Sequence, residues 1–242
     1  MIPIVAWVDM ANAVIAGVLA LRLFVSYKKS YSRSIKLFFI TYVFFALYMF
    51  FAAGAGLLTK NPDNMVYTNT LSFAFLYLAS IMVIQIPFLF MKHDTWERTS
   101  TLLLAAMGAA GIWGIFTTSS PHEFLIFGPY VYWRPIMGGW VRILSGVIAL
   151  YATITFITVF LKLRRASTDN PTVYRRSTHL AYGMICLLIG SVLNFVVGIA
   201  TSFLAILAGT LIAGLGLIIM AEGILRAERQ TEEKISSEKN NA

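Results

Sequence analysis

Five polar side chains interrupt the apolar stretches of this 242-residue chain: Asp9, Asn12, Asn69, Arg142 and Asn194. A charged group at the centre of a membrane-crossing helix costs roughly 2.5 to 3.5 kcal/mol on insertion scales, so each is a functional candidate by default. Asp9 and Arg142 carry opposite charges, and we expect them to form an ion pair. We expect the five side chains to lie at similar depth and, where their faces converge, to form a polar pocket that opens outward.

Aromatic residues add to this expected pocket. Tyr130, Tyr132 and Trp133 shortly precede Trp140. Aromatic walls with a few convergent polar groups are typical of a small-molecule site. The alternative is structural, because Trp and Tyr also form belts at membrane interfaces and polar side chains also hold helices together. The candidate ligand-binding residues are Asp9, Asn12, Asn69, Arg142, Asn194, Tyr130, Trp133 and Trp140.

The residue types that catalysis or a metal centre would need are scattered. His93 and His179 fall at one side of the expected membrane and His122 at the other, so they cannot share one metal ion. The single cysteine, Cys186, excludes an internal disulfide and a cysteine cluster. Ser145 precedes a glycine but lacks the surrounding nucleophile-elbow motif. We therefore expect no enzyme, no cofactor and no metal site.

The composition identifies the elements that must position these side chains. Hydrophobic residues make up 58% of the chain and charged residues only 12%, with a mean hydropathy of +0.75. Soluble domains are typically about a quarter charged. These values, and the unbroken apolar runs, exclude a soluble globular domain, a disordered chain and a disulfide scaffold. The chain is expected to reside in a lipid bilayer.

Seven stretches are long and apolar enough to cross the membrane, which takes about 20 residues as a helix. We predict an all-α integral membrane protein, with a seven-transmembrane-helix bundle over residues 1–223 and a charged helical tail over residues 224–242. The expected spans are approximately residues 3–25, 35–58, 66–91, 99–117, 139–161, 178–199 and 202–223.

The distribution of positive charge predicts the orientation. Of the 19 lysines and arginines, all but Lys60, Arg134 and Arg142 fall around alternate connections or in the tail. The positive-inside rule then places the N-terminus outside and the C-terminus in the cytoplasm of a multi-pass protein in the cell membrane. The same basic surface faces anionic lipid, so the net charge of +8 needs no nucleic acid to explain it.

The tail continues the last span without a helix breaker. A rough heptad runs from Leu217 to Ile235, and Lys234 and Glu238 are oppositely charged at a spacing of four residues, which supports a helix. One interpretation is a solvated helical extension. The other is a short helix that binds a protein partner or pairs with a second copy of the chain.

The layout resembles the seven-helix N-terminal sensor region of bacterial and archaeal histidine kinases. The resemblance rests on three features. The loop at residues 117–122 is followed by the aromatic residues 130–133, and a basic stretch at residues 174–183 begins the expected sixth span, which contains Gly190 and Asn194. The expected seventh span ends at residues 223–226, just before a charged helix. No kinase or phosphoacceptor domain follows in this sequence. The resemblance therefore implies a prokaryotic, stand-alone sensor-like domain that signals through a partner.

These observations favour a non-enzymatic sensor or receptor that binds a small or lipid-like ligand near the outer face and signals through its C-terminal helix. An accessory subunit of a larger membrane complex and a small transporter are the alternatives. A transporter would carry polar groups through the midplane. Here the middle third is nearly all apolar, apart from Gln85 and the threonines at 153, 155 and 158.

Overall fold

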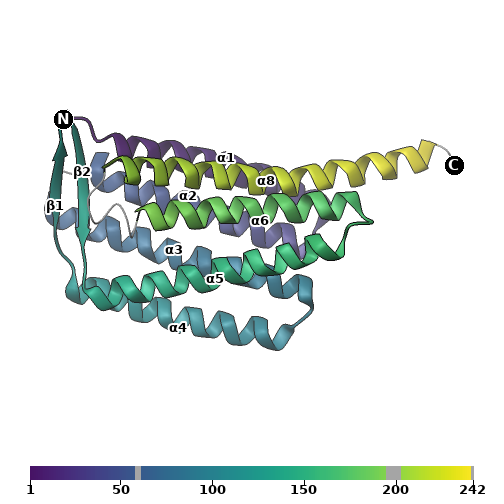
Figure 1. Ribbon diagram of the computed structural model, residues 1–242, viewed down its shortest axis with the longest axis horizontal. Helices are drawn as coiled ribbons and strands as arrows, with labels where there is room; N and C mark the ends of the chain where they lie inside the picture. Colours follow the sequence, from purple (N-terminus) through teal and green to yellow (C-terminus); the bar gives the residue numbers. More distant parts are fainter. Residues whose placement is uncertain (58–60, 195–202, 241–242) are drawn as a thin grey trace.

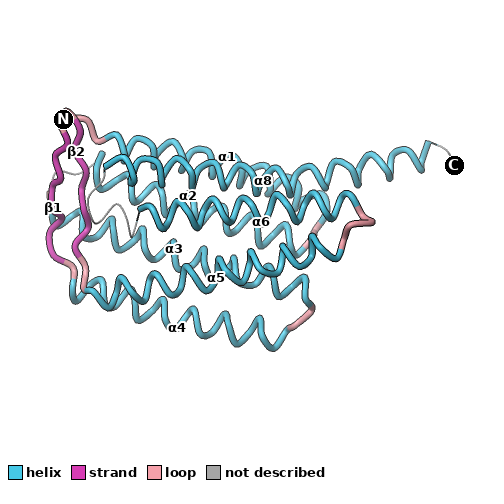
Figure 2. Tube along the Cα trace, in the orientation of Figure 1, coloured by secondary structure: helices cyan, strands magenta, loops and turns pink. Residues whose placement is uncertain are grey.

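Long helices, set side by side along one axis, build the computed structural model of this chain (Figure 1). It describes residues 1–57, 61–194 and 203–240. Two strands cover one end of the helices, and the last helix projects from the other end (Figure 2). The helices are α1 (Ile4–Ser30), α2 (Arg33–Leu57), α3 (Pro62–Met91), α4 (Asp94–Thr118), α5 (Gly139–Ala166), α6 (Pro171–Val192) and α8 (Phe203–Asn240), and the strands are β1 (Ser120–Phe127) and β2 (Tyr130–Ile136).

Six of these helices are long and apolar enough to cross a membrane: all of them except α6, within the described ranges. The expected sixth span, residues 178–199, extends past the end of α6, and its residues 195–199 lie outside the described residues. The expected connection at residues 200–201 and the first residue of the expected seventh span, residue 202, also lie outside them. The chain is therefore a helical, multi-pass membrane protein.

Charged residues at the helix ends explain why the helices run past the expected spans. α1 continues to Ser30, and Lys28 and Lys29 lie in its last turn, where positive charge opposes the negative end of the helix dipole. α4 begins at Asp94 and carries both Asp94 and Glu97 in its first turn, where negative charge is favourable. Each helix thus includes a polar turn that the apolar window leaves out.

The last helix runs through both the expected last span and the expected tail. α8 is continuous from Phe203 to Asn240, so the division expected at residues 223–224 falls within one helix. Its C-terminal part projects beyond the other helices (Figure 1). The connections α1–α2, α3–α4 and α5–α6 lie at this same end, and the N-terminus lies at the opposite end with the strands. The two ends of the bundle are therefore chemically different, because the lysine- and arginine-rich turns gather at one of them.

A β-hairpin replaces the plain connection expected between residues 118 and 138. β1 and β2 pair antiparallel around a turn in which Gly128 has φ +59°, a conformation that glycine adopts without strain. Ile2 extends this sheet, because its N–H donates to Pro129 O at 2.8 Å and its carbonyl accepts from Val131 N at 3.1 Å. The start of the chain is thus fixed to the hairpin.

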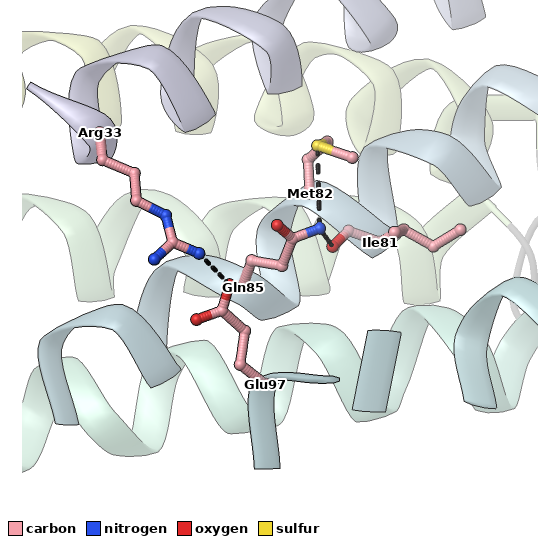
Figure 3. A network of polar contacts seen from close by, with 5 residues as sticks. All are labelled: Arg33, Ile81, Met82, Gln85 and Glu97. Carbon is pink, nitrogen blue, oxygen red and sulfur yellow. Dashed lines mark hydrogen bonds and ion pairs between the residues drawn. The ribbon is translucent and has the colours of Figure 1, made fainter. Parts of the chain in front are cut away.

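The half of the bundle away from the hairpin is filled by side chains. Phe38, Phe156 and Phe160 are fully buried there, and the Phe156 and Phe160 rings lie 4.5 Å apart. An ion pair between Arg33 at the start of α2 and the buried Glu97 of α4 joins two helices at this end (Figure 3). This half of the bundle therefore has a packed apolar core.

Close backbone contact joins α6 to α8. A Cβ on Gly190 would lie 2.6 Å from Gly209 O, and a Cβ on Gly209 would lie 2.8 Å from Gly190 O. Small residues allow membrane helices to approach at this distance. Gly209, one of several small residues along α8, thus faces α6 at this point.

Candidate functional site

A cavity of about 320 Å³ lies at the hairpin end of the bundle. Its walls come from α1, α2, α3, α5, α6 and α8, and β2 contributes Val131, Tyr132 and Trp133. Ligand pockets usually measure roughly 300 to 1,000 Å³, so this volume suits a small ligand or one part of a larger one. Because the opposite half is filled by the phenylalanine core, the cavity ends within the bundle.

Three of the expected site residues face this cavity without a partner. Asp9 on α1, Asn69 on α3 and Arg142 on α5 line it together. Asn69 is only 8% exposed. Within the part of the chain that the structure describes, the three side chains form no hydrogen bond and no ion pair, and the expected Asp9–Arg142 pair is not formed. A carboxylate, an amide and a guanidinium are thus all open to a ligand.

Tyrosine hydroxyls extend this polar region. Tyr48 on α2 lines the cavity and lies close enough to Asp9 and Tyr132 to interact electrostatically with both. Ser72 donates a hydrogen bond to the Tyr48 carbonyl at 3.1 Å, which ties α3 to α2 beside the cavity. Tyr132 is among the aromatic residues predicted for the pocket, but Tyr48 is not, because it lies in an aromatic run of the second span and the sequence does not reveal which way each ring points.

The other two asparagines predicted for the site, Asn12 and Asn194, form hydrogen bonds between helices. Asn12 is 5% exposed and donates from Nδ2 to Thr210 O at 2.8 Å, which links α1 to α8. Asn194 donates to Thr210 Oγ1 at 3.4 Å, and it also lines the cavity. The buried Asn194 Oδ1 has no hydrogen-bond partner among the described residues. Asn12 is absent from the described lining of the cavity, whereas Asn194 has a part in both the helix contact and the cavity wall.

The expected aromatic residues separate into three environments. Trp133 lines the cavity and lies over α2, where a Cβ on Gly56 would come within 3.3 Å of its ring. Tyr130 stacks on Phe203 of α8, with ring centroids 5.3 Å apart. Trp140 is 49% exposed and its ring lies against Gly114 of α4. Only Trp133 of these three is in the described cavity lining.

Apolar side chains form the deeper wall. Phe73, Leu76 and Leu188 line this part. The lining follows α5 from Arg142 to Thr153, which is about 16 Å along a helix that rises 1.5 Å per residue. The charged groups therefore sit near the hairpin, and the deeper wall is mainly apolar, with Thr153 at its far end on α5.

Two further polar side chains, Gln85 and Ser145, are already engaged within the protein. Gln85 on α3 donates to Ile81 O at 3.1 Å and its Nε2 lies 4.0 Å from the Met82 sulfur (Figure 3). The deep Ser145 hydroxyl bonds to Tyr77 at 2.6 Å and to Val141 O at 2.8 Å. The Gln85 amide nitrogen and the Ser145 hydroxyl are thus already engaged in contacts within the protein.

The arrangement offers charged groups to a ligand. Asp9 and Arg142 offer opposite charges, and no described hydrogen bond pairs a nucleophile with a base at the cavity. No group of three or more histidine, cysteine, aspartate or glutamate side chains suited to a metal ion occurs among the described residues. No protein-family model matches the chain, and no curated protein matches it.

Proposed function

We propose that this chain is a non-enzymatic, seven-helix membrane sensor that binds a ligand in the hairpin-end cavity and signals through α8. The observation that carries the proposal is the set of three cavity-facing side chains, Asp9, Asn69 and Arg142, that have no partner in the described structure. A few convergent polar groups in an otherwise apolar pocket fix a ligand's orientation and provide specificity. An incoming ligand would satisfy them.

The orientation is part of this proposal. The connections that carry most lysines and arginines share the end from which α8 projects. Under the positive-inside rule this end faces the cytoplasm, and the hairpin and cavity face outward. With α6 as the remaining span the chain would cross the membrane seven times, so that the two chain termini lie on opposite sides of the cell membrane.

The packing supports a sensor over a transporter. A transporter site needs access from both sides of the membrane. The buried rings of Phe38, Phe156 and Phe160 fill the half beyond the cavity. Gln85, the polar side chain that the sequence offered for a midplane site, bonds to its own helix.

The geometry of α8 supports the output route. Ile206 and Thr210 line the cavity, and the same helix continues to Asn240. Its 38 residues give about 57 Å of continuous helix, nearly twice the 30 Å hydrocarbon thickness of a bilayer. A ligand in the cavity thus touches the element whose other end would contact a partner, as the resemblance to histidine-kinase sensor regions also implies.

Site-specific photocrosslinking in native cells tests this function. A photoreactive residue at Ile235 should crosslink to a signalling protein such as a kinase, and Asp9→Asn or Arg142→Gln should change the crosslinking yield several-fold at equal expression. The control position is Leu204, which is 72% exposed on the same helix. A crosslinked respiratory or transport subunit, with a yield that ignores both cavity substitutions, would support the accessory-subunit alternative instead.

A further inference from the structure

We propose that the ligand is a single-chain amphiphile with a zwitterionic headgroup, which enters the cavity from the bilayer between α5 and α6. This inference rests on the proposed function and adds the ligand class and its route. Three observations carry it: where the cavity reaches the surface, how its polarity changes along α5, and which charges stand unpaired at its polar end.

The exposed part of the cavity wall lies on α5 and α6. Among the described lining residues, only Gly146, Leu150 and Val192 are exposed, with Leu150 at 43% and Val192 at 40%. Gly146 and Leu150 are one helical turn apart on α5. The residues at the hairpin side of the cavity, including Val131 and Met137, are buried or half-buried. The described surface opening therefore faces sideways.

This opening lies at a depth where lipid surrounds the protein. Gly146 is seven residues into α5, about 10 Å from its start, and Leu150 is about 6 Å deeper. Both belong to the apolar part of a helix long enough to span the membrane. Exposed glycine, leucine and valine at this depth admit an apolar chain more readily than a hydrated solute, which would have to leave its water.

The lengthwise gradient of polarity matches an amphiphile. The Arg142 guanidinium lies in the first turn of α5, near the hairpin, and Leu76, Leu188 and Leu150 line the deeper part. An acyl chain would lie along this wall with its head toward the hairpin. A small, fully polar solute would leave the leucine side chains in contact with water.

The unpaired charges specify the headgroup. Arg142 would bind a phosphate or carboxylate, for which a guanidinium offers two parallel N–H donors. Asp9 would bind an ammonium group, and the buried Asn69 amide would hydrogen-bond between them. Because Asp9 and Arg142 form no ion pair with each other in the described structure, each can pair with the opposite charge of one zwitterion.

Native mass spectrometry of the full chain in nonionic detergent tests the ligand class. The probes are lysophosphatidylethanolamine, which is zwitterionic, lysophosphatidylglycerol, which is anionic, and free phosphoethanolamine. We expect one lysophosphatidylethanolamine per chain, bound more tightly than either other probe. Arg142→Gln and Asp9→Asn should each weaken binding about tenfold or more, the loss expected for one charge-assisted hydrogen bond.

A substitution in the opening tests the route. A Cβ at Gly146 meets nothing within 4 Å, so Gly146→Phe is expected to fold and to place its ring in the opening. It should slow lysophosphatidylethanolamine binding several-fold. The control is Gly17→Phe on α1, where a Cβ also meets nothing within 4 Å and which is absent from the cavity lining.

The outcomes separate this inference from the function beneath it. Tight binding of phosphoethanolamine with no effect of Gly146→Phe would overturn the lateral amphiphile and leave a ligand-binding cavity. Preference for lysophosphatidylglycerol, unaffected by Asp9→Asn, would overturn the zwitterionic headgroup. Unchanged photocrosslinking at Ile235 in the cavity variants would overturn the sensor itself, whichever probe binds.

Discussion

Gly183 of α6 and Gly216 of α8 face each other so closely that neither can carry a side chain in place. A Cβ on Gly183 would lie 2.7 Å from Gly216 O, and a Cβ on Gly216 would lie 2.6 Å from Gly183 O. With the pair formed by Gly190 and Gly209 nearer the hairpin, this contact fixes α8 against α6 along their shared length. The two helices are therefore expected to move as one unit.

Enlarging this contact should destabilise the protein. Gly216→Val places methyl groups against the α6 backbone, and overpacking of this kind costs about 1 to 3 kcal/mol. The measurement is the midpoint of unfolding in sodium dodecyl sulfate, followed by circular dichroism. Gly17→Val is the control, because a Cβ there meets open space. Equal shifts in the two variants would show that the α6–α8 contact can accommodate the larger side chain.

Two asparagines should respond differently to the same truncation. Asn12→Ala removes the hydrogen bond to Thr210 O and should lower the free energy of unfolding by about 1 kcal/mol, as for hydrogen bonds between membrane helices. Asn69→Ala removes an amide with no described partner and should change it by less than about 0.5 kcal/mol. Detergent unfolding of both variants measures this difference. A larger loss from Asn69→Ala would assign that residue a structural role.

The Arg33–Glu97 ion pair should show an asymmetric response. The Glu97 side chain is 10% exposed and that of Arg33 is 58% exposed. Arg33→Gln leaves a buried carboxylate unpaired and should cost more than Glu97→Gln, which removes the buried charge. Since solvent screens the pair on the Arg33 side, the coupling in a double-mutant cycle should be about 1 kcal/mol or less. Additive effects of the two substitutions would show that the pair contributes no stability.

Trp133 should control access from the aqueous side of the hairpin. In a Cys186→Ser background, Asn69→Cys places a thiol at the cavity wall. Adding Trp133→Ala removes the ring that covers α2 there, and labelling by a membrane-impermeant maleimide should become several-fold faster. Trp140→Ala is the matched control, because that ring lies against α4. Acceleration by both substitutions would indicate general loosening of the hairpin end.

Depth along a helix could be predicted from the sequence, but rotation about the helix could not. A rise of 1.5 Å per residue places Asp9, Asn12 and Arg142 at the same end of the bundle once the helices alternate in direction. Three residues along α1 also rotate the side chain by about 60° about the axis. That rotation turns Asn12 toward Thr210 while Asp9 lines the cavity. Only the packing of the neighbouring helices determines which side chain faces the cavity and which faces another helix.

The hairpin escaped prediction because a count of apolar residues does not distinguish short strands from other short apolar runs. Residues 124–127 and 130–133 are rich in aromatic and branched residues, and Gly128 with Pro129 separates them, which is typical of a hairpin. The partner from the start of the chain could not be foreseen, because Ile2 joins the sheet only through the tertiary fold. The expected ends of the spans differ from the helices for a local reason, the polar terminal turns.

The Asn12–Thr210 hydrogen bond joins residues 198 positions apart. Proteins are synthesised at roughly 5 to 20 residues per second, so the Asn12 amide would wait about 10 to 40 s for α8 to emerge from the ribosome. During that time α1 resides in the membrane with an unmet polar group. A nascent chain that stalls before Phe203 thus displays this amide to the cell's membrane quality control, and synthesis of the last helix conceals it.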